Sequence, residues 1–460
     1  MLPSVRPFPY KRVCVFGAAR SGVGAMHLLR HHNVEVTLVD ERPAMEFRSL
    51  IRRLRRLYVT AHFGPTKEDV LRGCEAIILS PGIPVEHPLV QRAIEKDLPV
   101  ISEVELASYY AKAPIIAITG TNGKTTSTIL TGQMVTDSGI NAVVSGNIGR
   151  AFSDAVLSSQ DESRKTVLVT EVSSFQLESI EEFRPHVAVI LNITRDHMDR
   201  YPSMREYIDA KFRITLNQDE TDYLVLNEDD PAVMKVAEET NAQIRTLSLE
   251  HEVEEGAYLS NGKIYLKENG ESIHFCNVED IPIPGHHNIQ NTLASLIMCR
   301  AIGIGIESLR KTLQKFKGVE HRIEPVASRN DGVRFYNDSK ATNVDSLEKA
   351  LLSFDKPVIL IAGGKDKQSA YDRLNSLIKQ RVKGLVLIGE ATPLIKKAWG
   401  HLVPTKEAAT MEDAVKLAGS MAVTGDVVLL SPACSSFDMF KDYEDRGRAF
   451  KRCVRGYLGL

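Results

Sequence analysis

Short apolar runs, each followed by a polar or glycine-rich loop, recur from one end of the chain to the other. They cover residues 13–16, 34–39, 76–79, 115–118, 166–170, 186–191, 333–336, 357–362 and 426–430. Nearly continuous apolar runs of this length, with helical patterns between them, are typical of strands in parallel sheets. The pattern therefore predicts an α/β protein. Residues 223–283 differ, because Asn261-Gly262 and Asn269-Gly270 are hairpin signals and indicate a more irregular, β-rich region.

The run at residues 115–118 leads into Gly120-Thr-Asn-Gly-Lys-Thr-Thr126 and then into a helical pattern. A strand, a glycine loop and a helix that opens with Lys-Thr predict a phosphate-binding loop. Backbone N–H groups converge on phosphate oxygens, Lys124 can reach the outer phosphates, and the Thr125 hydroxyl suits Mg²⁺. Only two residues separate Gly120 from the Gly-Lys pair, fewer than in the general pattern. The alternative is a glycine-rich turn that binds nothing.

The N-terminal region carries a second glycine loop. The first apolar run is followed by Gly17-Ala-Ala-Arg-Ser-Gly22, and the second ends at Asp40. This spacing resembles a dinucleotide fingerprint, but Ala19 stands where a glycine would let the backbone approach a pyrophosphate. The third run leads into Ser80-Pro-Gly-Ile-Pro84, at a strand end where ligands of open α/β sheets bind. A nucleotide or nucleotide-sugar site is expected; the alternative is a domain that only packs.

Acidic residues follow two strands of the central region. Glu171 comes directly after the run at 166–170, where a carboxylate suits Mg²⁺ beside a phosphate-binding loop. The run at 186–191 leads into Asp196-His197-Met-Asp199. A histidine between two aspartates in a loop after a strand fits a site role and a structural role equally well.

One lysine stands out in the helical pattern that follows. Ser203 and Glu206 form a capping-box pattern, so a helix is expected to begin directly after Ser203. Tyr207 and Ile208 mark its apolar face, and Lys211 falls on the same face. The side chain can snorkel to the surface. If it is held inside, desolvation lowers its pKa and leaves a neutral amine that can react with CO₂. The resulting carbamate would be a carboxylate-like Mg²⁺ ligand.

Lysines and hydroxyl residues gather after three strands of the last third of the chain. The loops are Asn337-Asp-Ser-Lys-Ala-Thr-Asn343, Gly363-Gly-Lys-Asp-Lys367 and Ser431-Pro-Ala-Cys-Ser-Ser-Phe437. Because the carboxyl ends of parallel strands share one edge of a sheet, these loops predict a site for a small anionic ligand.

Three domains are expected from these patterns. They are a Rossmann-like N-terminal domain at 1–112, a central P-loop ATPase-type domain at 113–318 and a C-terminal Rossmann-like α/β domain at 319–460. Near the end of the central domain, Asn288 and Asn291 lie one turn apart on an expected helix. They can hold a purine or phosphate there; simple capping by Asn288 is the alternative.

The net charge, the apolar runs and the cysteine spacing indicate which kinds of partner and compartment to expect. The 460 residues include 57 Lys and Arg against 59 Asp and Glu, so the formal net charge of −2 creates no field for nucleic acid or an anionic membrane. The N-terminus has no apolar signal segment and no apolar run is long enough to span a bilayer, so a cytoplasmic protein is expected. The six cysteines include no C-x-x-C pair and are expected to be reduced thiols.

The order of these motifs resembles the Mur ligase family across nearly the whole chain. The resemblance rests on Gly120-Thr-Asn-Gly-Lys-Thr, Gly146-Asn-Ile-Gly149, Glu171-Val-Ser-Ser-Phe-Gln-Leu177, Asp196-His-Met-Asp199, Lys211, Gly285-His-His-Asn288, His321-Arg-Ile-Glu324 and the loop at 337–343. Leu430-Ser-Pro-Ala-Cys-Ser-Ser-Phe437 and Glu444-Asp-Arg-Gly447 are most similar to members that add D-glutamate to UDP-N-acetylmuramoyl-L-alanine. The resemblance implies an ATP-dependent amide ligase of peptidoglycan precursor synthesis that works through an acyl phosphate, with a monomer expected.

The resemblance also implies roles for individual residues. ATP would be held by Gly120, Thr121, Asn122, Gly123, Lys124, Thr125, Thr126, Asn288, Asn291, Arg322 and Asp338. Two Mg²⁺ ions would be held by Thr125, Glu171, His197 and Lys211 as a carbamate, with Lys124, Glu171, His197 and Lys211 catalytic. The UDP-substrate would contact Ala19, Arg20, Ser21, Asp40, Glu41, Arg42, Ser80, Gly82 and Asn147. D-Glutamate would contact Lys340, Thr342, Lys367, Ser436, Phe437 and Tyr443, while the third domain closes on ATP.

Several alternatives stay open at this point. Lys365 competes with Lys367 as the ligand for D-glutamate. A folylpolyglutamate synthetase or a Mur ligase for another amino acid would share most of the motifs. An NAD(P)-dependent oxidoreductase would leave Lys124, Glu171, His197 and Lys211 unexplained, and a nucleotide-binding switch would bind ATP without amino-acid-stimulated phosphate release.

Overall fold

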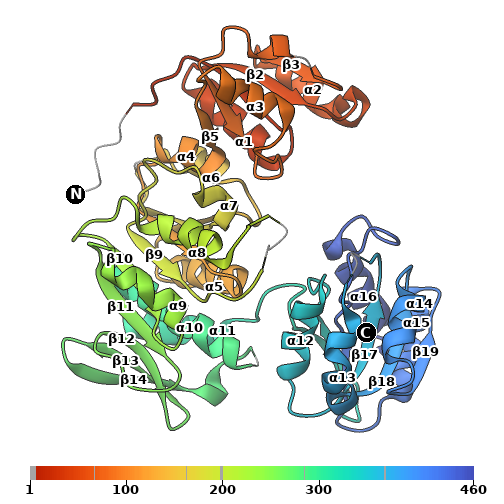
Figure 1. Cartoon of the computed structure of the whole chain (residues 1–460). Coiled ribbons are helices and arrows are strands. Elements are labelled where there is room, and N and C mark those ends of the chain that lie inside the picture. Colours follow the sequence, from red (N-terminus) through yellow and green to blue (C-terminus); the bar gives the residue numbers. More distant parts are fainter. Residues whose placement is uncertain (1–6, 67, 162, 197–199, 284, 367–368) are drawn as a thin grey trace. The chain divides into compact units, whose positions relative to one another are not determined.

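The computed structural model describes residues 7–66, 68–161, 163–196, 200–283, 285–366 and 369–460. The chain divides into two compact units, one of Met1–Asp280 with Ile289–Gln314 and one of Ile281–Asn288 with Lys315–Leu460. The first unit contains two sheets and the second contains one, and helices pack against each of them (Figure 1). The predicted α/β class with three α/β bodies is confirmed, while the residues at which the three domains begin and end stay a prediction.

The N-terminal sheet is entirely parallel in the described residues, with the strand order β3-β2-β1-β4-β5. On one face of this sheet, alternate residues of the strands pack against the apolar faces of α1 and α2 and form a core. The elements are β1 (Arg12–Phe16), α1 (Arg20–His31), β2 (Glu35–Asp40), α2 (Arg48–Arg56), β3 (Thr60–Phe63), β4 (Ala76–Leu79), α3 (Pro88–Glu95), β5 (Val100–Ser102) and α4 (Glu103–Ser108).

The central sheet has the order β14-β13-β12-β11-β10-β9-β6-β8-β7 in the described residues. Strands β6 to β12 run parallel to one another, and the two predicted hairpins add β13 and β14 antiparallel. The elements are β6 (Ile115–Thr119), α5 (Lys124–Asp137), β7 (Asn141–Gly146), α6 (Phe152–Ser158), β8 (Thr166–Glu171), α7 (Ser174–Leu177), β9 (Val187–Ile190), α8 (Met204–Phe212), β10 (Tyr223–Asn227), α9 (Pro231–Met234), β11 (Gln243–Ser248), β12 (Gly256–Ser260), β13 (Lys263–Glu268), β14 (Glu271–Asn277), α10 (His286–Ala301) and α11 (Ile306–Lys315).

The sheet of the second unit has the order β15-β16-β20-β17-β18-β19, parallel except for β15. Helices α12 and α13 contribute to the core on one side, and α15 and α16 to the core on the other. The elements are β15 (Glu324–Ser328), β16 (Arg334–Asn337), α12 (Val344–Leu352), β17 (Val358–Gly363), α13 (Asn375–Arg381), β18 (Val382–Ile388), α14 (Thr392–Trp399), β19 (Thr405–Glu407), α15 (Met411–Met421), β20 (Val427–Leu430) and α16 (Tyr443–Leu458).

The sheet orders decide which loops meet. In the first sheet, β2 and β4 flank β1, so the loops after all three strands lie at one crevice, where the strand order reverses. In the central sheet, β8 lies beside β6 and brings Glu171 to the phosphate-binding loop. In the last sheet, β16, β20 and β17 are adjacent, so the three lysine- and hydroxyl-bearing loops lie at one edge as predicted.

Two expectations from composition can be compared with the fold. All six cysteines are free thiols, as predicted. None of the helices in the described part of the chain combines the length and the apolar character that crossing a bilayer requires.

Candidate active site

The phosphate-binding loop is shaped by two glycines with positive φ. Gly120 has φ +141° and Gly123 has φ +86°, and Lys124 then begins α5. A Cβ atom on Gly123 would lie 2.2 Å from Oδ1 of Asn291 on α10, so glycine is required both by the backbone conformation and by this neighbour. The Ser127 hydroxyl donates to the same Oδ1 at 3.2 Å. Asn291 therefore fixes the start of α5 against α10.

The side chains of Lys124 and Thr125, which open α5, are both held by hydrogen bonds. Lys124 Nζ donates to the carbonyl oxygens of Gly120 (2.8 Å) and Thr121 (2.9 Å). The Thr125 hydroxyl donates to Oε2 of Glu171 at 2.8 Å, and both side chains are buried. A hydroxyl and a carboxylate in contact are hard oxygen donors, the kind of ligand that Mg²⁺ prefers. The residues present therefore fit a magnesium ion beside the loop.

Lys211 is held in the interior rather than snorkelling. Its side chain is 1% exposed, Nζ donates to the carbonyl oxygen of Gly120 at 3.0 Å, and Nζ lies 4.6 Å from the ring centre of Tyr207. Burial, reinforced by the charge of Lys124 and opposed by Asp196, lowers the pKa of Lys211 well below its usual value. The amine is thus neutral far more readily than that of a surface lysine, and it lies against the phosphate-binding loop.

A cavity of about 630 Å³ lies at the crevice of the N-terminal sheet. It is bounded by the loops after β1, β2 and β4 and by residues of the central domain in the same unit. Nine residues that the sequence singled out for a UDP-substrate line it together: Ala19, Arg20, Ser21, Asp40, Glu41, Arg42, Ser80, Gly82 and Asn147. These nine residues therefore border one cavity, while their role toward a UDP-substrate stays a prediction.

Asp40 organises the floor of this cavity. Its carboxylate accepts from the backbone N–H of Ala18 (2.7 Å) and from Nε and Nη2 of Arg42, both at 2.9 Å. Burial acts to raise the pKa of Asp40, but the hydrogen bonds from Arg42 and Ala18 outweigh it and hold this pKa below its usual value. Ala19 has φ −82° and ψ −169°, extended backbone that needs no glycine, which explains why alanine is tolerated here.

Asn147 connects the cavity to the phosphate-binding loop. It lines the cavity, its Nδ2 donates to Oε1 of Glu171 at 3.4 Å, and its backbone N–H donates to the carbonyl of Glu171 at 2.9 Å. Because Glu171 also accepts from Thr125, one carboxylate lies between the two sites. A ligand that fills the cavity toward Asn147 would end beside the phosphate-binding loop.

The loops at the edge of the last sheet carry most of the residues expected at D-glutamate. Lys340 Nζ lies 5.7 Å from the ring centre of Tyr443, Ser436 is buried, and Phe437 is two-thirds exposed. Thr342 follows in the same loop, where its N–H donates to the carbonyl of Lys340 at 2.9 Å. The predicted ligands Lys367 and, in the first unit, His197 lie outside the described residues.

Arg322 and Asp338, both expected at ATP, lie in the second unit, where the charge of Arg322 acts on Asp338. The Asp338 carboxylate is buried and accepts from the N–H of Ile323 (3.2 Å) and the hydroxyl of Ser431 (2.8 Å). Burial raises the pKa of Asp338 to about 7, against the opposing hydrogen bond of Ser431 and the charge of Arg322. Nε of Arg322 is buried and has no hydrogen-bond partner among the described residues.

Asn288 is the first of the two expected ATP ligands on α10, and the adjacent His287 has a shifted pKa. Asn288 is buried, one turn before Asn291. Burial, followed by the charges of Arg322 and Lys349, lowers the pKa of the adjacent His287 to about 4. The positive charge of Arg322 therefore acts on the start of α10 within the second unit.

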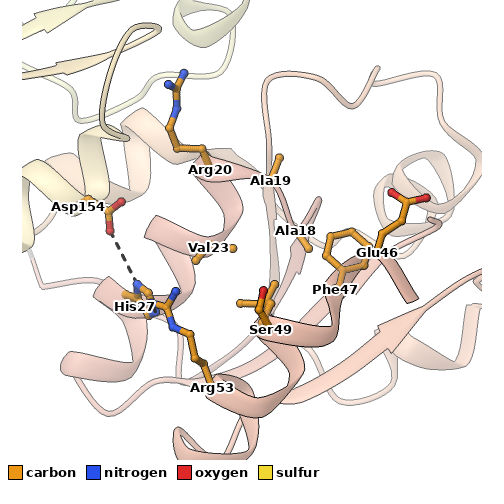
Figure 2. Close-up of a pocket in the computed structure, with 11 residues that line it drawn as sticks. Ala18, Ala19, Arg20, Val23, His27, Glu46, Phe47, Ser49, Arg53 and Asp154 are labelled. Atoms are coloured by element: carbon orange, nitrogen blue, oxygen red, sulfur yellow. Dashed lines mark hydrogen bonds and ion pairs between the residues drawn. The ribbon is translucent and has the colours of Figure 1, made fainter. Parts of the chain in front are cut away.

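A second hollow of about 500 Å³ shares Ala19 and Arg20 with the first cavity (Figure 2). Its charged side chains face one another: Nδ1 of His27 lies 3.9 Å from Oδ1 of Asp154, and Nη2 of Arg53 lies 3.3 Å from Nε2 of His27. The lining of the hollow contains two arginines, Arg20 and Arg53, and two carboxylates, Glu46 and Asp154, so their formal charges balance.

Comparison with known proteins decides the family. The MurD-like N-terminal domain of Mur ligases matches residues 11–102, the Mur ligase middle domain matches 118–299, and the glutamate ligase domain of Mur ligases matches 321–434. UDP-N-acetylmuramoylalanine–D-glutamate ligase of Trichlorobacter lovleyi is 42% identical over 97% of this chain and 98% of its own. The enzyme of that name from Geobacter sp. (strain M21) is 44% identical over 97% of both chains. The chain belongs to the Mur ligase family.

Solved structures of Mur ligases show the same fold. UDP-N-acetylmuramate-alanine ligase from Thermotoga maritima superimposes with a TM-score of 0.60 at 18% identity, covering 97% of this chain and all of that one. A pseudomurein peptide ligase type C from Methanothermus fervidus gives 0.58 at 19% identity, with the same coverage. Mur ligases are ATP-dependent ligases that act on small molecules, and this chain is an enzyme of that class.

The structure adds residues to this Mur ligase site that the sequence patterns missed. Asn192 pairs with Asn122 of the phosphate-binding loop, accepting from its N–H at 2.8 Å and donating to its carbonyl at 3.1 Å. His87 and Gln176 line the cavity, and Nε2 of His87 lies 3.2 Å from Oε2 of Glu41. Asn192 follows a predicted strand, a position that could have flagged it. Gln176 lies in the Glu171–Leu177 motif that follows a predicted strand, whereas His87 stands beyond the loop after β4 and carried no such signal.

Proposed function

We propose that this Mur ligase joins D-glutamate to UDP-N-acetylmuramoyl-L-alanine, with conversion of ATP to ADP and phosphate, as a cytoplasmic monomer in peptidoglycan precursor synthesis. The observation that carries the proposal is the similarity of 42–44% over 97% of the chain to ligases of that name. The structure supports it, because a cavity of about 630 Å³ lies at the crevice of the N-terminal sheet and a glycine loop with Lys124 begins α5.

In the first step, an oxygen of the substrate carboxylate attacks the γ-phosphorus of ATP and the bond to the bridging oxygen of ADP breaks. Two anions must approach each other, so concentrated positive charge is needed. Lys124 would exchange its bonds to the carbonyls of Gly120 and Thr121 for phosphate oxygens. Asn147 supports this arrangement, because it connects the substrate cavity to Glu171.

In the second step, the amine of D-glutamate attacks the acyl carbon, phosphate leaves, and the amide nitrogen loses a proton. The two carboxylates of D-glutamate would meet Lys340, Thr342, Lys367, Ser436, Phe437 and Tyr443. The buried Ser436 and the Lys340–Tyr443 contact support this assignment.

Magnesium would be held in two places. Thr125 and Glu171 fit the first, since their oxygens are 2.8 Å apart and buried. His197 and a carbamate on Lys211 would form the second. The neutral Lys211 amine would attack CO₂, one C–O π bond would open, and a proton would leave to solvent. Bound there, Mg²⁺ would offset the repulsion between carboxylate and γ-phosphate.

Phosphate release from ATP tests the proposal directly. The chain is incubated with Mg²⁺, ATP and UDP-N-acetylmuramoyl-L-alanine, and D-glutamate, L-glutamate, L-lysine or meso-diaminopimelate is added in turn. Stimulation by D-glutamate alone, with an amide product of the expected mass, is the predicted result. Stimulation by another amino acid would show that this amino acid, and not D-glutamate, is the substrate. The absence of stimulation by any of them would refute the proposed ligation.

A further inference from the structure

Arg446 is the most deeply buried charged group of the second unit that the proposed reaction does not use. It lies in the first turn of α16, and 1% of its surface is exposed. A buried guanidinium is costly unless its donors are satisfied, so its hydrogen bonds indicate what it holds in place.

Those hydrogen bonds go to three separate loops. Nε donates to the hydroxyl of Ser339 (3.0 Å) and Nη2 to the carbonyl of the same residue (2.9 Å). Nη2 also donates to the carbonyl of Cys434 (3.0 Å), and Nη1 to those of Ser435 (3.2 Å) and Gly363 (3.5 Å). The rigid planar fork of arginine is suited to holding several acceptors at fixed angles.

Each of these three loops carries residues assigned to the amino-acid substrate. Ser339 precedes Lys340, Gly363 ends β17 before Lys365 and Lys367, and Ser435 precedes Ser436. The Ser339 hydroxyl also donates to the carbonyl of Tyr443 at 2.8 Å, which draws in the start of α16. Every contact of Arg446 is therefore one to four residues away from an expected D-glutamate ligand.

The packing leaves this arrangement little freedom. A Cβ atom on Gly364 would lie 2.2 Å from the carbonyl oxygen of Ser435 and 3.0 Å from Nη1 of Arg446. A Cβ atom on Gly447 would lie 2.1 Å from Nδ1 of His321. Glycines on both sides thus let the guanidinium and the helix approach the loops closely.

The charge of Arg446 is not cancelled by an adjacent carboxylate. Its described hydrogen-bond acceptors are carbonyls and one hydroxyl, and none of the ion pairs found among the described residues includes it. Burial lowers the pKa of Arg446 to about 10, while Cys434, Asp438 and Asp338 act to raise it, so it remains a cation at neutral pH. It adds positive potential beneath a site for a dicarboxylate.

We infer that Arg446 is a positioning residue for the amino-acid substrate. It ties the three strand-end loops together from below and sets the affinity for D-glutamate without touching it. The inference rests on the proposed function, because it assumes that the amino acid binds at these loops.

Kinetics of the full-length enzyme test this role. Arg446→Met removes the donors and the charge, and the matched control Arg448→Met removes a half-exposed arginine of the same helix that pairs with Glu444. A tenfold change in affinity corresponds to about 1.4 kcal/mol of binding free energy, so a modest displacement of the ligand-bearing loops is enough to produce it. We expect KM for D-glutamate to rise by about tenfold or more in Arg446→Met, with KM for ATP and for the UDP-substrate changing less than about twofold. Arg448→Met should match the parent enzyme.

Two further variants separate positioning from general damage. Arg446→Lys keeps the charge but cannot reach three loops, so it should behave like Arg446→Met; recovery by lysine would overturn the cross-linking role. Ser339→Ala removes one acceptor and should raise KM for D-glutamate by a smaller factor. Trp399, the single tryptophan, is fully buried in the same unit, so its fluorescence reports whether each variant is folded.

The outcomes distinguish the inference from the proposed function. A parent enzyme without D-glutamate-stimulated phosphate release would refute the proposed function, whatever the variants do. A responsive parent enzyme combined with an equal rise of KM for ATP and D-glutamate in Arg446→Met and Ser339→Ala would refute the positioning role. An unchanged KM for D-glutamate in both variants would refute it as well.

Discussion

Nζ of Lys211 lies 3.0 Å from the carbonyl oxygen of Gly120, the first glycine of the phosphate-binding loop. A buried lysine with a lowered pKa in contact with this loop is positioned for chemistry rather than for a surface charge. It is therefore the residue whose replacement tests the proposed carbamate most directly.

We expect Lys211→Ala to lower the rate of D-glutamate-dependent phosphate release by about a hundredfold or more, because an anionic metal ligand is lost. Acetate or propionate should restore part of the rate by entering the space that the side chain leaves. Lys235→Ala, at an exposed position of the same unit, is the control and should keep full activity. Full activity in Lys211→Ala would remove this residue from the mechanism.

Asp40→Asn should weaken binding of the UDP-substrate. The carboxylate holds both the glycine loop and Arg42, and a lost charge-assisted hydrogen bond costs about 1.5–3 kcal/mol. KM for the UDP-substrate is expected to rise by about tenfold or more, with KM for D-glutamate unchanged, in initial-rate measurements. The control is Glu46→Gln, because Glu46 lies 3.9 Å from Arg42 on the exposed side. Equal effects of both variants would contradict the assignment.

Glu105 should be a stability determinant of the first unit. Its buried carboxylate accepts from three consecutive backbone N–H groups, those of residues 181, 182 and 183, at 2.8–3.0 Å. Glu105→Ala leaves these donors without an acceptor, which is expected to cost about 3 kcal/mol or more. In urea unfolding followed by far-UV circular dichroism, the midpoint of the transition that belongs to the first unit should move to a lower urea concentration.

The fluorescence transition of Trp399, which lies in the second unit, should not move in Glu105→Ala. Glu95→Ala, which removes an exposed pair with Arg92, is the control and should cost less than about 0.5 kcal/mol. A Trp399 transition that shifts as far as the circular dichroism transition would show that the effect is not local.

Glu103 predicts a pH dependence of stability. Burial, opposed by hydrogen bonds from Ser153, raises the pKa of Glu103 from 4.5 to about 7. Between these values the folded state binds more protons than the unfolded state, so this contribution is full below pH 4.5 and is lost as the pH rises through 7. The shift corresponds to a loss on the order of 3 kcal/mol.

Glu103→Gln removes this titration while keeping an acceptor for Ser153. The fall in the urea midpoint of the first unit between pH 5 and 8 should therefore be smaller in the variant than in the parent enzyme. Identical pH profiles would show that Glu103 does not change its protonation in this range.

Local patterns in the sequence predicted the strands and the loops at their carboxyl ends, because burial and turn chemistry act within a few residues. Asp40 and Ser80 line one cavity because they stand at the carboxyl ends of the two parallel strands that flank β1, whereas Asn147 follows a strand of the central sheet and was assigned only from the family resemblance. Contacts between distant segments could not be predicted. The hydrogen bonds of Glu105 to residues 181–183 and of Arg446 to three loops depend on how helices pack on the sheets, and the sequence carries no periodic signal for them.

Asn147 belongs to the cavity and also touches the carboxylate that accepts from Thr125. If occupation of the cavity reorients Asn147 and Glu171, the affinity for nucleotide changes by some factor. Thermodynamic linkage then requires nucleotide to change the affinity of the cavity by the same factor. A compound that fills the cavity alone would consequently alter how tightly the enzyme holds ATP, which makes this amide a point of communication between the two substrates.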